Sequence, residues 1–416
     1  MRKIIINGGK KLNGDITISG AKNSAVALIP GALLCDEEVE ISNVPNISDV
    51  DALEEILLYL NAKIERKDDH IVIINSKDTI NKPINDELAK KLRASYYFMG
   101  ALLGKYKHVE MSFPGGCSIG KRPIDLHLKG FKALGAKVSG DDENIILDAD
   151  ELVGTDIYLD FASVGATINI MFAAVKAKGI TTIKNAAKEP EIPNIADLLN
   201  KMGAKINGAG TDIITIEGVD YLKSCKHSVL PDRIEAGTYI ILGAACGKKI
   251  TVKNIVPKHI DSLLEKLKEM NVSMKIGKNS VTIKERKTIK ATEIITLVYP
   301  GFPTDLQQVL ASLMTKAKGV STIEETIWEN RFLNLYEIAK MGAKIEVNGD
   351  KAFISGPSNL KGTEVNATDL RAGAGLVVAA LMAEGETVIN NADYVLRGYE
   401  NIVEKLTKVG ADIKLV

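Results

Sequence analysis

The sequence is poor in the residue types that build metal centres and disulfide frameworks. Its 416 residues include four cysteines and five histidines. The cysteines lie far apart without metal-ligand spacing and the histidines are scattered, so we expect no metal site. The N-terminus lacks a signal-peptide pattern, so we expect a cytoplasmic protein with reduced cysteines.

Charge of one sign and long apolar runs are missing as well. The 53 basic and 53 acidic residues cancel, so no overall field would attract nucleic acid or an anionic membrane, and any anion site must be a local cluster. No segment approaches the roughly 18 uninterrupted apolar residues of a membrane helix. Aromatic residues make up only 5% of the chain, but 45% of it is hydrophobic, which indicates a globular protein of two or three domains.

The sequence contains a clear internal repeat. A helix end, a small turn and a strand recur about every 70 residues. Each turn has glycine or asparagine as its second residue, which favours the left-handed conformation that ends many helices. The turns are therefore predicted helix exits. They begin at Leu60, Leu134, Met202, Met270, Met341 and Val409.

A second series of helices runs through the same units. Each is rich in small residues and apolar on nearly all sides, as in Val378-Ala-Ala-Leu-Met-Ala, and a short strand follows it. A helix that is apolar all round is predicted to be buried. The unit is thus a buried helix, a strand, an amphipathic helix and a hairpin, and six such units are too many for one core. We predict an α/β protein of two domains with three repeats each.

Residues 1–19 belong to no complete unit. The runs Ile4-Ile-Ile-Asn and Gly14-Asp-Ile-Thr-Ile predict an extra hairpin that closes the sheet of the last unit. The predicted domains are therefore 22–230, and 1–21 together with 231–416.

Polar residues gather where the buried helices are predicted to begin. The N-terminus of a helix suits anions, because its N–H groups are unpaired and the helix dipole is positive there. We expect the positive ends of three helices to meet on one face of each domain, and two such faces to form a cleft for phosphates and carboxylates. The polar residues are Lys22, Asn23, Arg93, Ser95, Ser163, Thr167, Asp232, Arg233, Thr304, Asp305, Thr368, Asp369 and Arg371.

Each of these residues has a structural alternative. Thr304 with Gln307 matches a capping box, and Asp305 would then only complement the helix dipole. Lys22, Arg93 and Arg371 would be ordinary surface cations. Recurrence at equivalent positions of the repeat favours a binding role.

One cysteine stands in an unusual segment, Pro-Gly-Gly-Cys-Ser-Ile-Gly-Lys-Arg-Pro at 114–123. Lys121, Arg122 and a helix that begins near Ile124 should lower the pKa of the Cys117 thiol. The alternative is a small residue in a tight turn, because free cysteines are usually buried and inert. The glycines and cations favour a reactive thiol.

Several motifs together match a known family. They are Gly20-Ala-Lys-Asn-Ser24, Leu92-Arg-Ala-Ser95, Pro114-Gly-Gly-Cys-Ser-Ile-Gly, Arg122-Pro-Ile-Asp-Leu-His127, Ser163-Val-Gly-Ala-Thr167, Glu189-Pro-Glu191, Phe302-Pro-Thr-Asp305, Glu329-Asn-Arg331 and Arg397-Gly-Tyr-Glu400. Along nearly its whole length the chain resembles bacterial UDP-N-acetylglucosamine 1-carboxyvinyltransferases, which commit this sugar nucleotide to peptidoglycan. The resemblance implies an inside-out α/β barrel in each domain, with helices buried and sheets outside.

The resemblance also implies an activity. The family transfers the enolpyruvyl group of phosphoenolpyruvate to the 3'-hydroxyl of UDP-N-acetylglucosamine, by addition and elimination through a tetrahedral ketal, and releases phosphate. It implies no cofactor, and we expect a monomer with no nucleic-acid or membrane partner. Two alternatives remain open: a 5-enolpyruvylshikimate-3-phosphate synthase-like enzyme, whose family lacks the cysteine loop, and a non-catalytic protein that binds nucleotide sugars.

Site residues follow from the resemblance by matching position. Cys117 would protonate phosphoenolpyruvate or add to it covalently, and it would be the residue that fosfomycin alkylates. Asp305 would take the proton of the sugar hydroxyl. The remaining expectations are Lys22, Asn23, Arg122 and Arg397 for phosphoenolpyruvate; Asn23, Arg93, Arg122, Pro123, Ile124, Asp125, Leu126, Ser163, Val164, Asp305 and Ile327 for UDP-N-acetylglucosamine; and Glu189, Arg331 and Arg371 for anions or closure. The catalytic set is Cys117, Asp305, Lys22 and Arg397. The chain departs from many relatives at Phe161, where they carry a lysine.

Overall fold

The computed structural model describes residues 2–115, 124–285 and 288–416. These residues form two compact units. The first unit comprises residues 20–115 and 124–230, and the second comprises 2–19, 231–285 and 288–416. Gly20 and Ala21, which we expected in the second domain, belong to the first unit. Within the described ranges no helix is long and apolar enough to cross a membrane.

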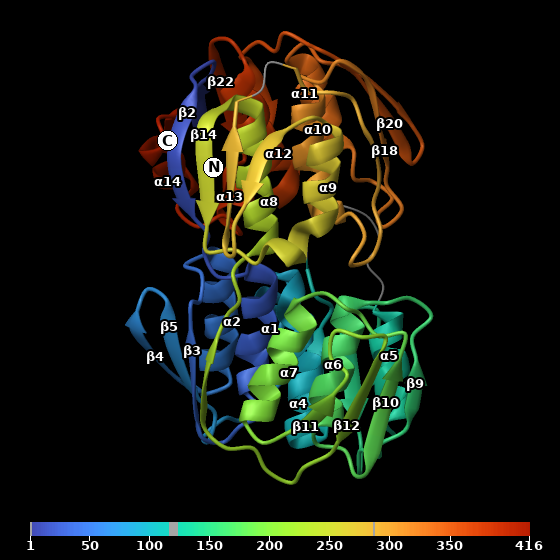
Figure 1. Ribbon diagram of the computed structural model, residues 1–416. Helices are drawn as coiled ribbons and strands as arrows, with labels where there is room; N and C mark the ends of the chain where they lie inside the picture. Colours follow the sequence, from blue (N-terminus) through green and yellow to red (C-terminus); the bar gives the residue numbers. More distant parts are fainter. Residues whose placement is uncertain (1, 116–123, 286–287) are drawn as a thin grey trace. The chain divides into compact units, whose positions relative to one another are not determined.

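Each unit has its apolar helices inside and its sheets outside (Figure 1), which confirms the predicted fold class. Small residues let these helices approach closely. A Cβ atom added to Gly375 would lie only 2.6 Å from the carbonyl oxygen of Gln308, for example. The buried helices are α1 (Lys22–Ala32), α4 (Tyr97–Tyr106) and α6 (Val164–Ala174) in the first unit, and α8 (Arg233–Cys246), α10 (Thr304–Met314) and α12 (Leu370–Met382) in the second.

Each repeat also has an amphipathic helix, which ends in a residue with positive φ as predicted. The exit residues are Asn61, Gly135, Gly203, Asn271, Gly342 and Gly410, with φ between 65° and 106°. The amphipathic helices are α2 (Ser48–Tyr59), α5 (Asp125–Ala133), α7 (Glu191–Lys201), α9 (Asp261–Glu269), α11 (Leu333–Lys340) and α14 (Ile402–Lys408). Short helices are α3 (Asp86–Ala89), η1 (Arg93–Tyr96), η2 (Pro257–Ile260) and α13 (Asp393–Leu396).

The sheets of the first unit are ordered β13-β3-β5-β4, β6-β8-β7 and β9-β10-β12-β11. Their strands are β3 (Glu38–Ser42), β4 (Lys63–Asp68), β5 (Ile71–Asn75), β6 (His108–Ser112), β7 (Lys137–Gly140), β8 (Asn144–Asp148), β9 (Asp156–Tyr158), β10 (Ile180–Lys184), β11 (Lys205–Asn207), β12 (Ile213–Glu217) and β13 (Cys225–Ser228).

The sheets of the second unit are ordered β2-β14-β16-β15, β17-β18-β20-β19 and β21-β22-β1-β23. Their strands are β1 (Ile4–Asn7), β2 (Leu12–Thr17), β14 (Gly247–Lys253), β15 (Ser273–Ile276), β16 (Ser280–Lys284), β17 (Glu293–Ile295), β18 (Gly319–Glu324), β19 (Lys344–Asn348), β20 (Lys351–Gly356), β21 (Glu364–Asn366), β22 (Glu386–Asn390) and β23 (Asp412–Leu415). In each four-stranded sheet an edge strand pairs in parallel with a central strand that a buried helix precedes.

The predicted N-terminal hairpin is wrong, although the predicted closure of the last sheet is right. Strand β1 lies between β22 and β23, whereas β2 pairs in parallel with β14 in another sheet. Strand β13 precedes α8 along the chain but pairs with β3 of the first unit. The chain thus passes between the units after Ser19 and after Leu230, and at each passage the strand before a unit's first buried helix stays in the other unit.

Asparagines tie the central strands to the edge strands at four corners. Each follows a central strand with positive φ, and its side-chain amide donates to the carbonyl of the residue just after the edge strand. We call them the corner asparagines: Asn43 to Val229, Asn185 to Leu159, Asn254 to Ile18 and Asn391 to Ala367. The other two repeats have Phe113 and Glu325 at this position.

Candidate active site

Lys22 and Asn23 begin helix α1 of the first unit, as predicted. The Lys22 ammonium lies 2.9 Å from a carboxylate oxygen of Asp49, and their side chains are 17% and 3% exposed. Asp49 lies in the first turn of α2 and was not among the residues predicted from the sequence. Because Asp49 contacts the ammonium, Lys22 is held in place at the start of a buried helix.

Arg93 lies in η1, and its guanidinium donates to the carbonyl of Pro114 at 3.4 Å. It also lies 5.9 Å from the centre of the Tyr96 ring. Arg93 is therefore anchored to the segment that leads towards the predicted cysteine loop.

His127 is a buried member of this region that sequence reasoning did not single out. Its Nδ1 lies 2.9 Å from the amide nitrogen of Asn169, and the oxygen of that amide accepts a 2.8 Å bond from the backbone N–H of Gly100. The Asn169 nitrogen must therefore donate, which places the His127 proton on Nε2. Burial, assisted by the charge of Arg93, lowers the pKa of His127 to about 3, so the ring is neutral at pH 7.

The start of α6 packs against this histidine. A Cβ atom added to Gly165 would lie 2.9 Å from His127 Cε1 and 3.0 Å from the Tyr96 hydroxyl. Ser163 caps the helix, because its hydroxyl accepts from the N–H of Ala166 at 3.3 Å. The structure thus brings η1, the start of α5 and the start of α6 together, and with them the predicted nucleotide-binding residues Arg93, Ile124, Asp125, Leu126, Ser163 and Val164.

Three other predicted residues, Cys117, Arg122 and Pro123, lie outside the described residues. The described cysteines Cys35, Cys225 and Cys246 are free. Burial raises the pKa of all three thiols, to about 11 for Cys225 and about 12 for Cys246. Among the described cysteines, then, no thiol is activated.

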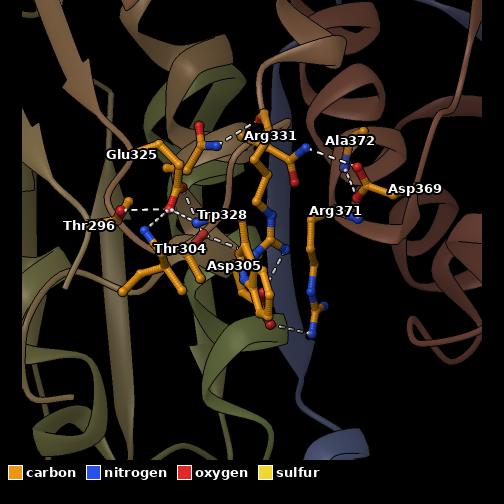
Figure 2. A network of polar contacts seen from close by, with 12 residues as sticks. Thr296, Thr304, Asp305, Glu325, Trp328, Arg331, Asp369, Arg371 and Ala372 are labelled. Carbon is orange, nitrogen blue, oxygen red and sulfur yellow. Dashed lines mark hydrogen bonds and ion pairs between the residues drawn. The ribbon is translucent and has the colours of Figure 1, made fainter. Parts of the chain in front are cut away.

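In the second unit, Asp305 lies between two buried arginines (Figure 2). One carboxylate oxygen is 2.7 Å from Arg331 Nη2 and the other is 3.4 Å from Arg371 Nη2. The arginine side chains are 3% exposed and that of Asp305 is 26% exposed. Burial opposes the charged carboxylate, but the charges of Arg331, Arg371 and Arg233 outweigh it and hold the pKa of Asp305 well below its usual range. Asp305 is therefore ionised at neutral pH.

Arg371 is fixed from several sides. Its backbone N–H donates to Asp369, the N-cap of α12, at 2.8 Å. Its guanidinium lies 5.4 Å from the centre of the Tyr399 ring, and the Tyr399 hydroxyl is 2.8 Å from that of Thr238. Arg397 stands two residues before Tyr399, at the end of α13. The segment that carries Arg397 thus also supplies Tyr399, whose ring lies beside the Arg371 guanidinium.

The structural alternative for Thr304, a capping box with Gln307, does not form. Pro303 is the N-cap of α10, and no side chain caps that helix. The Thr304 hydroxyl instead donates to Glu325 at 2.7 Å, and the Gln307 amide donates to the carbonyl of Arg331 at 2.9 Å. The Thr304 hydroxyl and the Gln307 amide therefore bond to residues far along the chain and not to each other's backbone at the helix start.

Two further predicted residues lie beside charged or polar groups. The backbone N–H of Ile327 donates to Glu325 at 2.9 Å. Glu189 is half-buried. Burial raises the pKa of Tyr97 well above its usual value, Tyr96 adds to this, and Glu191 and Glu189 contribute least. Roles for Ile327 and Glu189 in substrate binding stay predictions.

The matches to known proteins extend over nearly the whole chain. The family model described as EPSP synthase (3-phosphoshikimate 1-carboxyvinyltransferase) matches residues 6–406. UDP-N-acetylglucosamine 1-carboxyvinyltransferase 2 of Listeria monocytogenes serovar 1/2a is 54% identical over 411 residues, which cover 99% of this chain and 97% of the relative. The chain belongs to the UDP-N-acetylglucosamine 1-carboxyvinyltransferase family. The enzyme of the same name from Bacillus anthracis is 51% identical over 413 residues, which are 99% of this chain and 96% of the relative.

Solved structures agree with this family's fold. The enolpyruvyl transferase NikO from Streptomyces tendae superposes with a TM-score of 0.91 at 25% identity and covers 100% of this chain and 99% of its own. EPSP synthase from Acinetobacter baumannii, at 18% identity, has a TM-score of 0.78 over 100% of both chains and shares the fold. The similarity in sequence to this family and the similarity in fold therefore both extend over the two units.

Proposed function

We propose that this chain transfers the enolpyruvyl group of phosphoenolpyruvate to the 3'-hydroxyl of UDP-N-acetylglucosamine and releases phosphate. The observation that carries the proposal is Asp305, an ionised carboxylate held by Arg331 and Arg371 where helix α10 begins. It offers a proton acceptor beside cations, which an attack on an anionic substrate requires. Relatives of more than half identity carry the name of this activity.

The reaction takes place in two steps. In the addition, the 3'-hydroxyl oxygen bonds to C2 of phosphoenolpyruvate, its proton passes to Asp305, and C3 gains a proton from an acid, for which we propose Cys117. In the elimination, the tetrahedral ketal loses a proton from C3, the bond between C2 and the phosphate oxygen breaks, and phosphate leaves. A positioned acid or base of this kind contributes roughly 10² to 10⁴-fold to the rate.

Binding of the substrates is assigned by charge and position. Lys22, Asn23, Arg122 and Arg397 would hold the phosphate and carboxylate of phosphoenolpyruvate, since cations and the positive end of α1 favour both groups. The cluster around Arg93 and the start of α6 would hold the nucleotide. A cytoplasmic role in the first committed step of peptidoglycan synthesis belongs to the same proposal.

Phosphate release tests the function directly. The purified protein should release phosphate from phosphoenolpyruvate when UDP-N-acetylglucosamine is the acceptor, and not when shikimate 3-phosphate replaces it. Release only with the shikimate ester would favour the EPSP synthase-like alternative, and release with neither acceptor would favour a binding protein.

Alkylation tests the role of Cys117. We expect fosfomycin, an epoxide, to modify this thiol in the presence of the sugar nucleotide, and peptide mass spectrometry to locate the adduct. The described cysteines serve as internal controls, because burial raises the pKa of their thiols. A Cys117→Ser variant should remain unmodified; an adduct on that variant, or none on the unmodified protein, would contradict the assignment.

A further inference from the structure

The fifth repeat departs from the corner asparagines in a way that its strands do not require. Glu325 follows β18 where asparagine follows four other central strands, and it is only 4% exposed. A neutral amide ties the strands together elsewhere. A buried carboxylate costs more free energy than an amide unless its partners compensate fully. The substitution therefore points to a task beyond the tie between strands.

One oxygen of Glu325 accepts three hydrogen bonds beside this corner. Its Oε1 accepts from the hydroxyl of Thr296 at 2.8 Å, and Thr296 is the residue just after edge strand β17. The same oxygen accepts from the backbone N–H groups of Ile327 at 2.9 Å and Trp328 at 3.2 Å. The hydroxyl of Thr326 donates to the carbonyl of Thr296 and so takes the part of the corner amide, while Glu325 Oε1 fixes the turn that contains Ile327.

The other oxygen faces the start of α10. Glu325 Oε2 lies 2.7 Å from the hydroxyl of Thr304, which also receives a 2.9 Å bond from Arg331 Nη1. An arginine only donates, so Thr304 must accept from Arg331 and give its own hydrogen to Glu325. Arg331 Nη2 then donates to Asp305 at 2.7 Å. Figure 2 shows this directed chain of hydrogen bonds, which begins at Arg331 and ends at Asp305 on one side and Glu325 on the other.

We propose that Glu325 is a positioning residue for the reaction: through Thr304 it orients the Arg331 guanidinium that holds Asp305 in place. The inference rests on the proposed role of Asp305 as the proton acceptor. Glu325 itself touches no substrate in this account. Besides Arg331, the charged groups that act on Asp305 are Arg371 and Arg233.

The Glu325→Gln variant separates the two tasks. The glutamine oxygen can take the place of Oε1 and keep its three donors, which leaves the amide nitrogen facing Thr304. The Thr304 hydroxyl would then receive hydrogens from both the amide and Arg331, and the direction of the chain is lost. We expect kcat to fall roughly 10 to 100-fold, as small misplacements of catalytic groups do, with KM for phosphoenolpyruvate unchanged.

The pH profile supplies a readout that a merely structural role would not move. A loosened Arg331 stabilises the Asp305 carboxylate less, so the acidic limb of kcat/KM should shift to higher pH in the variant. Thr304→Val removes the same link and keeps Glu325. The two substitutions combined should cost less than the product of their separate effects, because they act through one hydroxyl.

Asn254→Gly is the matched control. It removes the 2.8 Å bond from the Asn254 amide to the carbonyl of Ile18 at an equivalent corner, and glycine tolerates the positive φ of 59°. This control should melt at a lower temperature with kcat and the pH profile unchanged.

The outcomes are distinguishable from failure of the proposed function. If the unmodified protein turns over and both Glu325→Gln and Thr304→Val keep its kcat and pH profile, the positioning role is overturned and the function stands. If the unmodified protein does not turn over, the function fails. A crystal structure of Glu325→Gln then decides the inference: Arg331 still bonded to both Thr304 and Asp305 would overturn it, and a displaced guanidinium would support it.

Discussion

At the scale of single residues, Asp305 combines a catalytic proposal with an unusual environment. Two arginines with almost no exposed surface contact its carboxylate. Such a carboxylate is a weak base until a substrate's own anionic groups draw on the same arginines. Its reactivity should therefore depend on the bound substrates, which is how binding energy is directed into a chemical step.

Replacing Asp305 by asparagine tests this proton acceptor. The amide oxygen can still accept from Arg331, but the side chain cannot take a proton. We expect kcat for phosphate release to fall by about 10² to 10⁴-fold, while calorimetry still detects binding of UDP-N-acetylglucosamine. Asp15→Asn is the control, since Asp15 and Lys253 form a half-exposed pair on β2 and β14. Equal turnover by both variants would remove Asp305 from the mechanism.

The sequence located candidate residues better than their partners. Lys22 and Asp305 could be placed because helix starts leave local signals. Asp49 and Glu325 could not, because each meets its partner through tertiary packing, across 27 residues for Lys22 and 21 for Thr304. Such a contact between distant residues leaves no periodic pattern in the sequence. The capping box considered as the alternative at Thr304 does not form for the same reason, since Glu325 accepts from the hydroxyl.

At the scale of elements, the amphipathic helices all end through a left-handed residue. Gly203 has a φ of 106°, and a Cβ atom added there would meet nothing within 4 Å. The Gly203→Ala substitution therefore isolates the backbone cost of that conformation, which we expect to lower the free energy of unfolding by about 1–2 kcal/mol. Urea unfolding followed by circular dichroism measures it.

Asn271 provides the matched control at the equivalent exit of the second unit, with a φ of 65°. Asn271→Gly keeps a residue that tolerates this region but removes the 3.2 Å hydrogen bond from the Asn271 amide to the carbonyl of Thr288, so we expect the free energy of unfolding to fall by only about 0.5 kcal/mol. A loss in Asn271→Gly as large as in Gly203→Ala would mean that side-chain contacts, not backbone conformation, decide these positions.

Strand pairing marks the limit of what the pattern reveals about elements. Alternation correctly placed two strands within residues 1–19, but it carries no information on the partner. Ile4 pairs with Ile389 and Leu415, at the opposite end of the sequence. The two neighbouring runs suggested a hairpin, but each strand pairs in a different sheet.

At the scale of the whole molecule, buried Glu235 and its partner Lys405 hold Ser19, the residue of the second unit after which the chain enters the first. Glu235 accepts from the backbone N–H of Ser19 at 2.8 Å and lies 2.6 Å from the Lys405 ammonium, which also donates to the Ser19 hydroxyl at 2.7 Å. Burial outweighs Lys405 and raises the pKa of Glu235 from 4.5 to about 7.

This shift predicts a pH-dependent stability. Between pH 4.5 and 7 the folded protein holds a proton on Glu235 that the unfolded chain has released. The free energy of unfolding contributed by Glu235 should therefore fall as the pH rises through this window and stay level above it. Urea unfolding of the unmodified protein and Glu235→Gln at several pH values isolates the effect. A difference between the two proteins that rises, or stays flat, from pH 4.5 to 7 would contradict it.

The exchange of strands between the units makes the two halves of the chain unequal. Every strand in the described sheets of the first unit comes from residues 20–230, including β13. Residues 231–416 lack β2 at a sheet edge and β1 between β22 and β23, so β23 would lose its only partner strand and β22 would keep only β21. We expect residues 20–230 expressed alone to melt cooperatively and residues 231–416 alone not to.

Residues 1–19, added as a peptide, should restore a cooperative transition in the second fragment, because they supply both missing strands. Thermal melting by circular dichroism measures all three samples. A cooperative melt of residues 231–416 without the peptide would contradict the prediction, because it would show that the second unit folds without the N-terminal strands.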